Sequence, residues 1–142
     1  MRIIHSKHFP QSYCLNFFGT LLVRDRVLML RYAQFLYLDP YESPQEAMYA
    51  WEKLRKTQEV LKMIIGKETL NEEAIHTEQM KWLGYIPYYI LYLLFYLGFL
   101  AVTFDHNTAY NLNPFEREAK ENKTNSSYIK KRKKYNWINY LW

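Results

Sequence analysis

The stretch Trp82–Phe104, WLGYIPYYILYLLFYLGFLAVTF, decides how this chain folds and where it lies. It contains 23 residues without a formal charge, between Lys81 and Asp105. As a helix it would be roughly 34 Å long, enough to cross a hydrocarbon core of about 30 Å with some tilt. Trp82 and Tyr85 at its beginning match the aromatic belt that forms at lipid headgroups. The sequence therefore predicts a single-pass transmembrane helix over residues 82–104.

Length and composition exclude several other classes of protein. A chain of 142 residues suits one small domain and has too little other apolar material to wrap such a helix in a soluble core, which is the alternative interpretation of the stretch. Eight Phe, four Trp and fourteen Tyr exclude intrinsic disorder. Cys14 is the one cysteine, so the chain forms no internal disulfide and no cysteine-based zinc site. Neither GxGxxG nor GxxxxGK occurs.

One face of the predicted span carries aromatic side chains at spacings of four, three, four and three. A Tyr hydroxyl near the bilayer centre loses its water, which costs about 2 kcal/mol or more if the group stays unpaired. A neighbouring transmembrane helix is the simplest source of acceptors, and exposure of these Tyr residues to lipid is the alternative. We therefore expect this face to contact a partner helix through Tyr85, Tyr89, Tyr92, Tyr96 and Phe99.

Residues 43–66 are predicted to form an amphipathic helix. Ser43-Pro44-Gln45-Glu46 has the residue types of a capping box, with Pro at the first helical position, and Gly66 ends the pattern. Apolar residues recur at helical spacing along it, which predicts a face that packs in a soluble core. That soluble packing face consists of Trp51, Leu54, Leu61 and Ile65.

The remaining boundaries complete a mainly α fold class. An N-terminal segment, residues 1–42, contains a short helix at about 23–38, and a helix over 69–104 continues into the span with a kink near Gly84–Pro87. Residues 105–142 are expected to form an extended soluble tail rich in basic and aromatic residues. The predicted architecture is thus a transmembrane helix preceded by amphipathic helices and followed by that tail.

The N-terminal residues resemble a targeting segment. Arg2, Lys7, Arg24 and Arg26 occur with no acidic residue before Asp25, a bias typical of mitochondrial targeting. The nine apolar or small residues from Leu15 to Val23 could instead act as a weak secretory h-region. We expect an uncleaved, mitochondrially targeted chain.

The tail combines the basic run Lys130–Lys134 with aromatic residues. Such a pattern can stack on single-stranded nucleic acid, lie on an anionic membrane surface, or hold the tail on a neighbouring protein. Because the predicted span ends 26 residues upstream (130 − 104), we expect phospholipid or protein contacts and no nucleic acid. The expected tail anchors are Tyr128, Arg132, Tyr135, Trp137, Tyr140 and Trp142.

Orientation cannot be derived from charge. Within 20 residues of the span, Lys62, Lys67 and Lys81 on one side balance Arg117, Lys120 and Lys123 on the other. Asn122-Lys123-Thr124 and Asn125-Ser126-Ser127 have the form of glycosylation acceptors, so a secretory-pathway single-pass glycoprotein or adaptor is the alternative class.

The order of a helical part, one span and a short tail resembles the accessory subunits of mitochondrial respiratory-chain complexes. Asn113-Pro114-Phe115-Glu116-Arg117-Glu118-Ala119 and the ending Tyr128 to Trp137 look like the charged, aromatic-ended tails that such subunits lay across their neighbours. The resemblance implies a non-catalytic inner-membrane subunit of a large hetero-oligomeric complex, with the tail in the intermembrane space. Of the candidate complexes, NADH:ubiquinone oxidoreductase ranks ahead of cytochrome c oxidase.

No catalytic, cofactor or metal site is predicted. Glu73-x-x-His76 has the spacing of half a di-iron carboxylate site, but the second copy that this chemistry needs is missing. His5-x2-His8 supplies two ligands, too few for a closed metal site. We therefore expect a protein that is not an enzyme and carries no cofactor.

Overall fold

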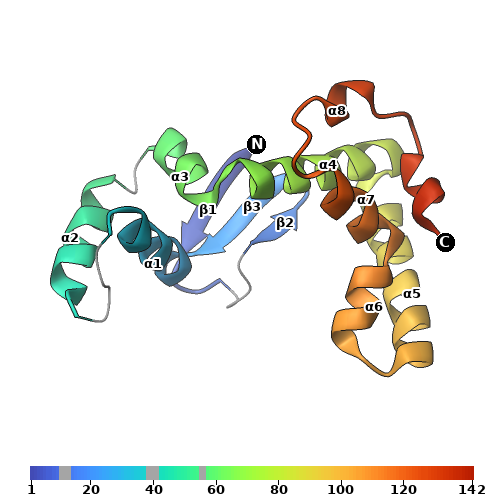
Figure 1. Ribbon diagram of the computed structural model, residues 1–142, viewed down its shortest axis with the longest axis horizontal. Coiled ribbons are helices and arrows are strands. Elements are labelled where there is room, and N and C mark those ends of the chain that lie inside the picture. Colours follow the sequence, from blue (N-terminus) through green and yellow to red (C-terminus); the bar gives the residue numbers. More distant parts are fainter. Residues whose placement is uncertain (10–13, 38–41, 55–56) are drawn as a thin grey trace. The chain divides into compact units, whose positions relative to one another are not determined.

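The computed structural model describes residues 1–9, 14–37, 42–54 and 57–142 (Figure 1). Length suggests one small domain, whereas the structure divides into two compact units. The N-terminal unit is Met1–Leu70 and the C-terminal unit is Asn71–Trp142. The boundary falls within one helix, so each unit is described by itself.

The N-terminal unit contains a three-stranded sheet, which the sequence analysis missed. Its strands are β1 (Arg2–Ser6), β2 (Leu15–Phe17) and β3 (Thr20–Arg24), in the order β1-β3-β2. β1 pairs with β3 in parallel, with Ile3 opposite Leu21, and β2 pairs with β3 antiparallel. Phe18 and Gly19 both have positive φ, which suits the two-residue turn of this hairpin.

Three helices follow the sheet: α1 (Asp25–Phe35), α2 (Pro44–Leu54) and α3 (Gln58–Ile65). Alternate strand residues and one side of each helix meet in a single apolar core. The core contains Ile3, Leu21, Val23, Leu28, Tyr32, Trp51, Leu61, Ile64 and Ile65. The helix expected at 23–38 begins only at Asp25, because Val23 belongs to the sheet, and residue 38 lies outside the described residues.

The single helix expected over 43–66 is wrong, since α2 ends at Leu54 and α3 begins at Gln58. Thr57 has extended dihedral angles (φ −105°, ψ 119°), which a continuous helix does not allow. The break places the Gln58 side chain beside β1, where it accepts a hydrogen bond from the Ile3 amide at 3.0 Å and donates one to the Ile3 carbonyl at 2.9 Å. Of the predicted packing face, Trp51, Leu61 and Ile65 are buried, and the side chain of Leu54 lies outside the described part.

The C-terminal unit is built around two long helices, α4 (Lys67–Leu83, of which Asn71 onward belongs to this unit) and α5 (Tyr85–Thr103). The continuous helix expected over 69–104 is interrupted between them at Gly84, which has φ 87° and ψ 143°. Residues other than Gly rarely adopt such angles, and Pro87 follows within the first turn of α5. The break lies at the Gly84–Pro87 kink that the sequence predicts.

The tail is helical, so the extended conformation expected for 105–142 is wrong. It forms α6 (His106–Leu112), α7 (Pro114–Asn122), α8 (Tyr128–Lys131) and the 3₁₀ helix η1 (Asn136–Tyr140). The Asp105 carboxylate accepts a hydrogen bond from the Thr108 amide and caps α6, and Asn113 caps α7 in the same way through the Phe115 amide. These caps, and burial of one side of α7, stabilise α6 and α7 in a segment whose composition suggested an extended chain.

The tail runs back along α5 (Figure 1). Near the end of α5, Tyr96 contacts His106, at the start of the tail. One turn earlier in α5, Tyr92 contacts Asn113 and Glu116. One further turn earlier, Tyr88 contacts Phe115. Later tail residues thus meet earlier residues of α5, which is the register of an antiparallel hairpin. The tail therefore packs against the helix that it was expected to leave behind.

Candidate functional site

Helix α5 is, among the described residues, the one helix long and apolar enough to cross a membrane. Only 6% of its most apolar 18-residue window is buried inside the structure. Leu94 is 60% exposed and Val102 78% exposed, although both side chains are apolar. The uncovered apolar face of α5 consists of Ile86, Ile90, Leu93, Leu94, Leu97 and Val102.

The Tyr side of α5 is covered by the chain itself. The Tyr92 hydroxyl donates a hydrogen bond to Glu116 Oε1 at 2.8 Å, and the Tyr96 hydroxyl hydrogen-bonds His106 Nδ1 at 2.5 Å. The Tyr89 hydroxyl lies 3.8 Å from the sulfur of Met80. The sequence analysis placed the acceptors for these hydroxyls on another polypeptide, whereas for these three residues the structure places them on the same chain.

The two other members of the predicted contact face are half-buried. Tyr85 packs against the core of the C-terminal unit, and the backbone carbonyl of Phe99 accepts a hydrogen bond from Thr103. That core joins the N-terminal half of α5 to the tail, because Phe115 lies against the rings of Tyr88 and Trp137 at centroid distances of 4.9 and 4.8 Å.

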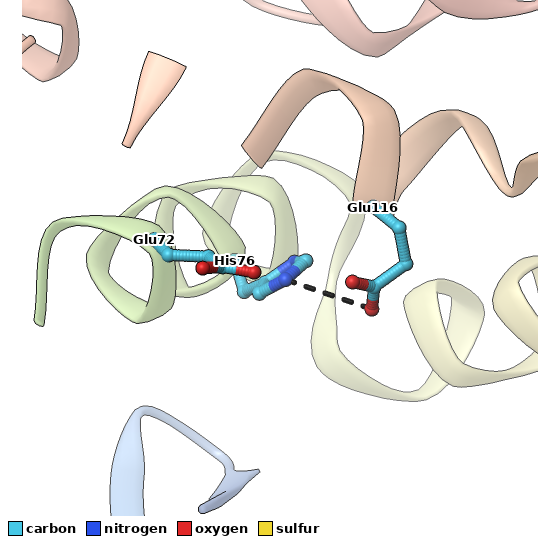
Figure 2. Close-up of side chains that lie close together, drawn as sticks. All are labelled: Glu72, His76 and Glu116. Atoms are coloured by element: carbon cyan, nitrogen blue, oxygen red, sulfur yellow. Dashed lines mark ion pairs between the residues drawn. The ribbon is translucent and has the colours of Figure 1, made fainter. Parts of the chain in front are cut away.

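A buried polar cluster lies where α4, α5 and α7 meet. His76 on α4 is 6% exposed and Glu116 on α7 is 4% exposed, and His76 Nε2 lies 3.7 Å from Glu116 Oε1 (Figure 2). Glu72, one helical turn before His76, completes a group of three residues whose ligand atoms all lie within 4.8 Å of one another. Figure 2 shows Glu72 and His76 on one helix and Glu116 facing them from another.

The hydrogen bonds of Gln79 determine which nitrogen of His76 carries a proton. Gln79 Nε2 donates to the Phe115 carbonyl at 3.1 Å and to Glu118 Oε2 at 2.9 Å, so Gln79 Oε1 is the atom that faces His76 Nδ1 at 2.9 Å. An amide oxygen only accepts, so Nδ1 must be the donor. In a neutral imidazole, Nε2 then presents its lone pair to the Glu116 carboxylate.

Charge in this cluster is concentrated on the carboxylates. Burial lowers the pKa of His76, but the charges of Glu116 and then Glu73 outweigh burial, and the pKa is raised overall. Burial, followed by the charge of Glu116, raises the pKa of the Tyr110 hydroxyl. The Nζ of the partly exposed Lys120 lies 4.0 Å from the other oxygen of Glu116, Oε2. A positive charge between His76 and the carboxylates would therefore be strongly favoured.

A second buried group fixes the tail. Arg132 donates from Nε to Glu118 Oε1 at 2.6 Å and from Nη2 to Oε2 at 2.9 Å, and both side chains are at most 1% exposed. The Tyr128 hydroxyl donates to the same carboxylate at 2.9 Å. Burial, followed by the charge of Glu118, raises the pKa of that hydroxyl.

The expected tail anchors occupy different environments. Tyr128 and Arg132 bind Glu118, Trp137 is buried in the C-terminal core, and the Tyr140 hydroxyl accepts a hydrogen bond from the Asn122 amide at 2.9 Å. Tyr135 is 39% exposed and Trp142 is 94% exposed. The structure thus brings four of the six residues onto the chain's own helices and leaves the other two at the surface.

The other residues considered for chemistry belong to the N-terminal unit. His5 Nδ1 lies 2.7 Å from Asp25, at the edge of the Trp51 ring, while His8 is exposed. The sequence offers Glu73-x-x-His76 as half a metal motif, which was rejected, and no prediction assigns a site role to Glu72, Gln79 or Glu116. The available signal for α7 was Asn113-Pro114-Phe115-Glu116, which has a cap, a Pro at the first position and an acid in the first turn.

Comparison of the chain with protein-family models, with curated proteins and with solved structures gives no match.

Proposed function

We propose that this chain is a non-catalytic accessory subunit of a mitochondrial inner-membrane respiratory complex. It stabilises the assembly by placing the uncovered apolar face of α5 against lipid and against membrane subunits of the complex. NADH:ubiquinone oxidoreductase is the preferred parent complex, ahead of cytochrome c oxidase, on the layout and tail resemblance described above.

The observation that carries this proposal is the exposure of α5. Contiguous apolar patches of this kind are rare on monomeric soluble proteins and indicate contact with a membrane or a partner. The face continues over the length of a 19-residue helix, about 28 Å, which is close to the thickness of a hydrocarbon core. The opposite side of α5 is already filled by Tyr88, Phe115 and their neighbours, so the uncovered side is the one available for assembly.

The alternative class, a secretory glycoprotein or adaptor, receives less support. In the first of the two possible acceptor sites the Asn122 side-chain amide donates to the Glu118 carbonyl at 2.8 Å and to the Tyr140 hydroxyl. A glycan on that nitrogen would replace one of its two hydrogens, so at least one of these hydrogen bonds would be lost.

The decisive experiment introduces a charged side chain into the uncovered apolar face of α5. A tagged chain is expressed in its native cells, and membranes are extracted with alkaline carbonate, or solubilised in mild detergent and separated by native electrophoresis. We expect the wild-type chain to resist carbonate and to migrate within a large complex with respiratory subunits. Leu94→Asp should reduce membrane retention roughly 100-fold, since Asp at the centre of a membrane helix costs about 2.5–3.5 kcal/mol.

Asn107→Asp provides the matched control, because it adds the same charge to the exposed polar side of α6. This variant should assemble like the wild type. A chain that carbonate releases and that migrates alone would contradict the proposal. A mobility shift on endoglycosidase treatment would instead favour the secretory alternative.

A further inference from the structure

The buried cluster of Glu72, His76 and Glu116 places two carboxylates beside one imidazole. Glu116 Oε2 is buried without a hydrogen-bond partner. An unsatisfied carboxylate oxygen in such a place is costly unless a cation satisfies it. Lys120 approaches that oxygen only to 4.0 Å, and its Nζ donates to Asn111 Oδ1 at 2.5 Å.

The orientation of His76 is that of a metal ligand. Its Nδ1 donates to Gln79 Oε1, which leaves Nε2 to face Glu116 Oε1 at 3.7 Å. Metal-binding His residues commonly donate their second ring N–H to an oxygen in this manner, and the bond fixes both tautomer and ring orientation. With a neutral imidazole and no cation between them, the lone pairs of Nε2 and Oε1 would repel each other.

The spacing of the three side chains suits a small divalent ion. Two ligands about 2.1 Å from a tetrahedral zinc ion lie about 3.4 Å apart, close to the 3.7 Å between His76 Nε2 and Glu116 Oε1. Glu72 and His76 are separated by one helical turn on α4, so both side chains lie on one side of that helix. Zinc accepts His nitrogen and carboxylate oxygen, and two carboxylates balance its charge.

We propose that Glu72, His76 and Glu116 bind one Zn²⁺ ion that joins α4 to α7, with water as the fourth ligand. The ion has a structural role: it connects a helix that precedes α5 to the tail that follows it. This inference goes beyond the assembly role proposed above and does not depend on it.

Metal analysis of the full-length chain tests the inference. The chain is purified in detergent, stripped with EDTA and dialysed against Zn²⁺, and bound metal is measured by plasma mass spectrometry. We expect one Zn²⁺ per chain. Co²⁺ in place of Zn²⁺ should give the intense visible absorption of a tetrahedral site.

Variants identify the ligands. Glu72→Gln and His76→Ala should each weaken Zn²⁺ binding by more than about 100-fold, because loss of an outer-shell partner alone weakens metal sites about 10- to 100-fold. Glu73→Gln is the matched control, since it removes the neighbouring carboxylate on the same helix, and it should retain one Zn²⁺. Helical content from circular dichroism, measured for each variant without metal, separates loss of the site from loss of the fold.

Two results would overturn the inference. One is wild-type protein that binds no Zn²⁺ above background, which would leave His76 as a protonated partner of Glu116. The other is a Glu73→Gln variant that loses Zn²⁺ as completely as Glu72→Gln does. Because neither measurement involves the parent complex, failure here is distinguishable from failure of the proposed function.

Discussion

At the scale of single residues, the Glu118–Arg132 pair contributes most clearly to the C-terminal unit. Both side chains are almost fully buried, and the two hydrogen bonds between them are parallel and short. Removing one partner of such a pair leaves an uncompensated buried charge, whereas replacing both with apolar residues is often neutral.

Arg132→Met should therefore lower the free energy of unfolding by about 3–5 kcal/mol. Denaturant titration in detergent micelles, followed by Trp fluorescence, measures the change. Lys130→Met, at an exposed position of α8 two residues before Arg132, should stay within about 0.5 kcal/mol of the wild type. The double variant Glu118→Leu/Arg132→Met should recover part of the loss, because it removes the unpaired charge but also the acceptor of Gln79 and Tyr128. A double variant less stable than Arg132→Met would contradict a dominant role for the unpaired charge.

The candidate metal site shows why sequence reasoning fails at this scale. Glu72 and His76 lie one turn apart, so helical spacing alone brings them together. Glu116 is 40 residues away from His76 (116 − 76), and only the return of α7 along α5 places its carboxylate there. The familiar spacing Glu73-x-x-His76 was considered and rejected, whereas the residue in the cluster is Glu72, four positions before His76.

At the scale of elements, Gly84 determines where α4 ends and α5 begins. Its φ of 87° and ψ of 143° lie in a region that only Gly occupies readily, and an added Cβ would lie 3.4 Å from Pro87 Cδ. Gly98, within α5, has ordinary helical surroundings and no heavy atom within 4 Å of such a Cβ.

Gly84→Ala should destabilise the C-terminal unit by about 1–3 kcal/mol. Gly98→Ala is the matched control and should be neutral or stabilising by up to about 1 kcal/mol, because Ala is the better helix former. The midpoint of thermal unfolding in the same detergent gives the comparison. Equal effects of the two substitutions would mean that the break at Gly84 is not required.

Elements with strong periodicity or capping signals were predictable, and short ones were not. The apolar run fixed α5 to within a few residues, and the kink at Gly84–Pro87 followed from the two residue types. The strands were not predicted, because β2 has only three residues and its pairing with β3 depends on the turn at Phe18 and Gly19. The tail helix α6 was not predicted, because it has one buried residue, Ala109, and so shows little hydrophobic periodicity.

At the scale of the whole molecule, the antiparallel hairpin of α5 and the tail constrains how the C-terminal unit meets a membrane. The Nζ of Lys134 lies 5.6 Å from the ring centroid of Trp82, so the tail returns to the end of α4, just before α5 begins. Charged helices such as α7 do not face lipid, and non-lipid surroundings must cover their outer side. The unit therefore suits a boundary between lipid on the α5 side and water or protein on the tail side.

This geometry predicts how two cysteines react when one is placed just before α5 and the other in the part of the tail that returns to it. In a Cys14→Ser background, Lys81→Cys and Lys133→Cys, both exposed, should react with an impermeant maleimide from the same side of mitoplast membranes. A tail on the far side of a single-pass helix, as the sequence resemblance implies, would make them react from opposite sides. Detergent-permeabilised samples, in which both cysteines should label fully, provide the control.

The side chain of Gln58 has a consequence for how the protein behaves before it meets any partner. An open strand edge is a template on which another chain can add a strand and begin to aggregate. The Gln58 side chain hydrogen-bonds both the amide and the carbonyl of Ile3, so these two groups on the edge strand β1 cannot pair with a strand of another chain. The opposite margin, β2, offers only three residues, so both edges of the sheet give another chain little backbone to pair with.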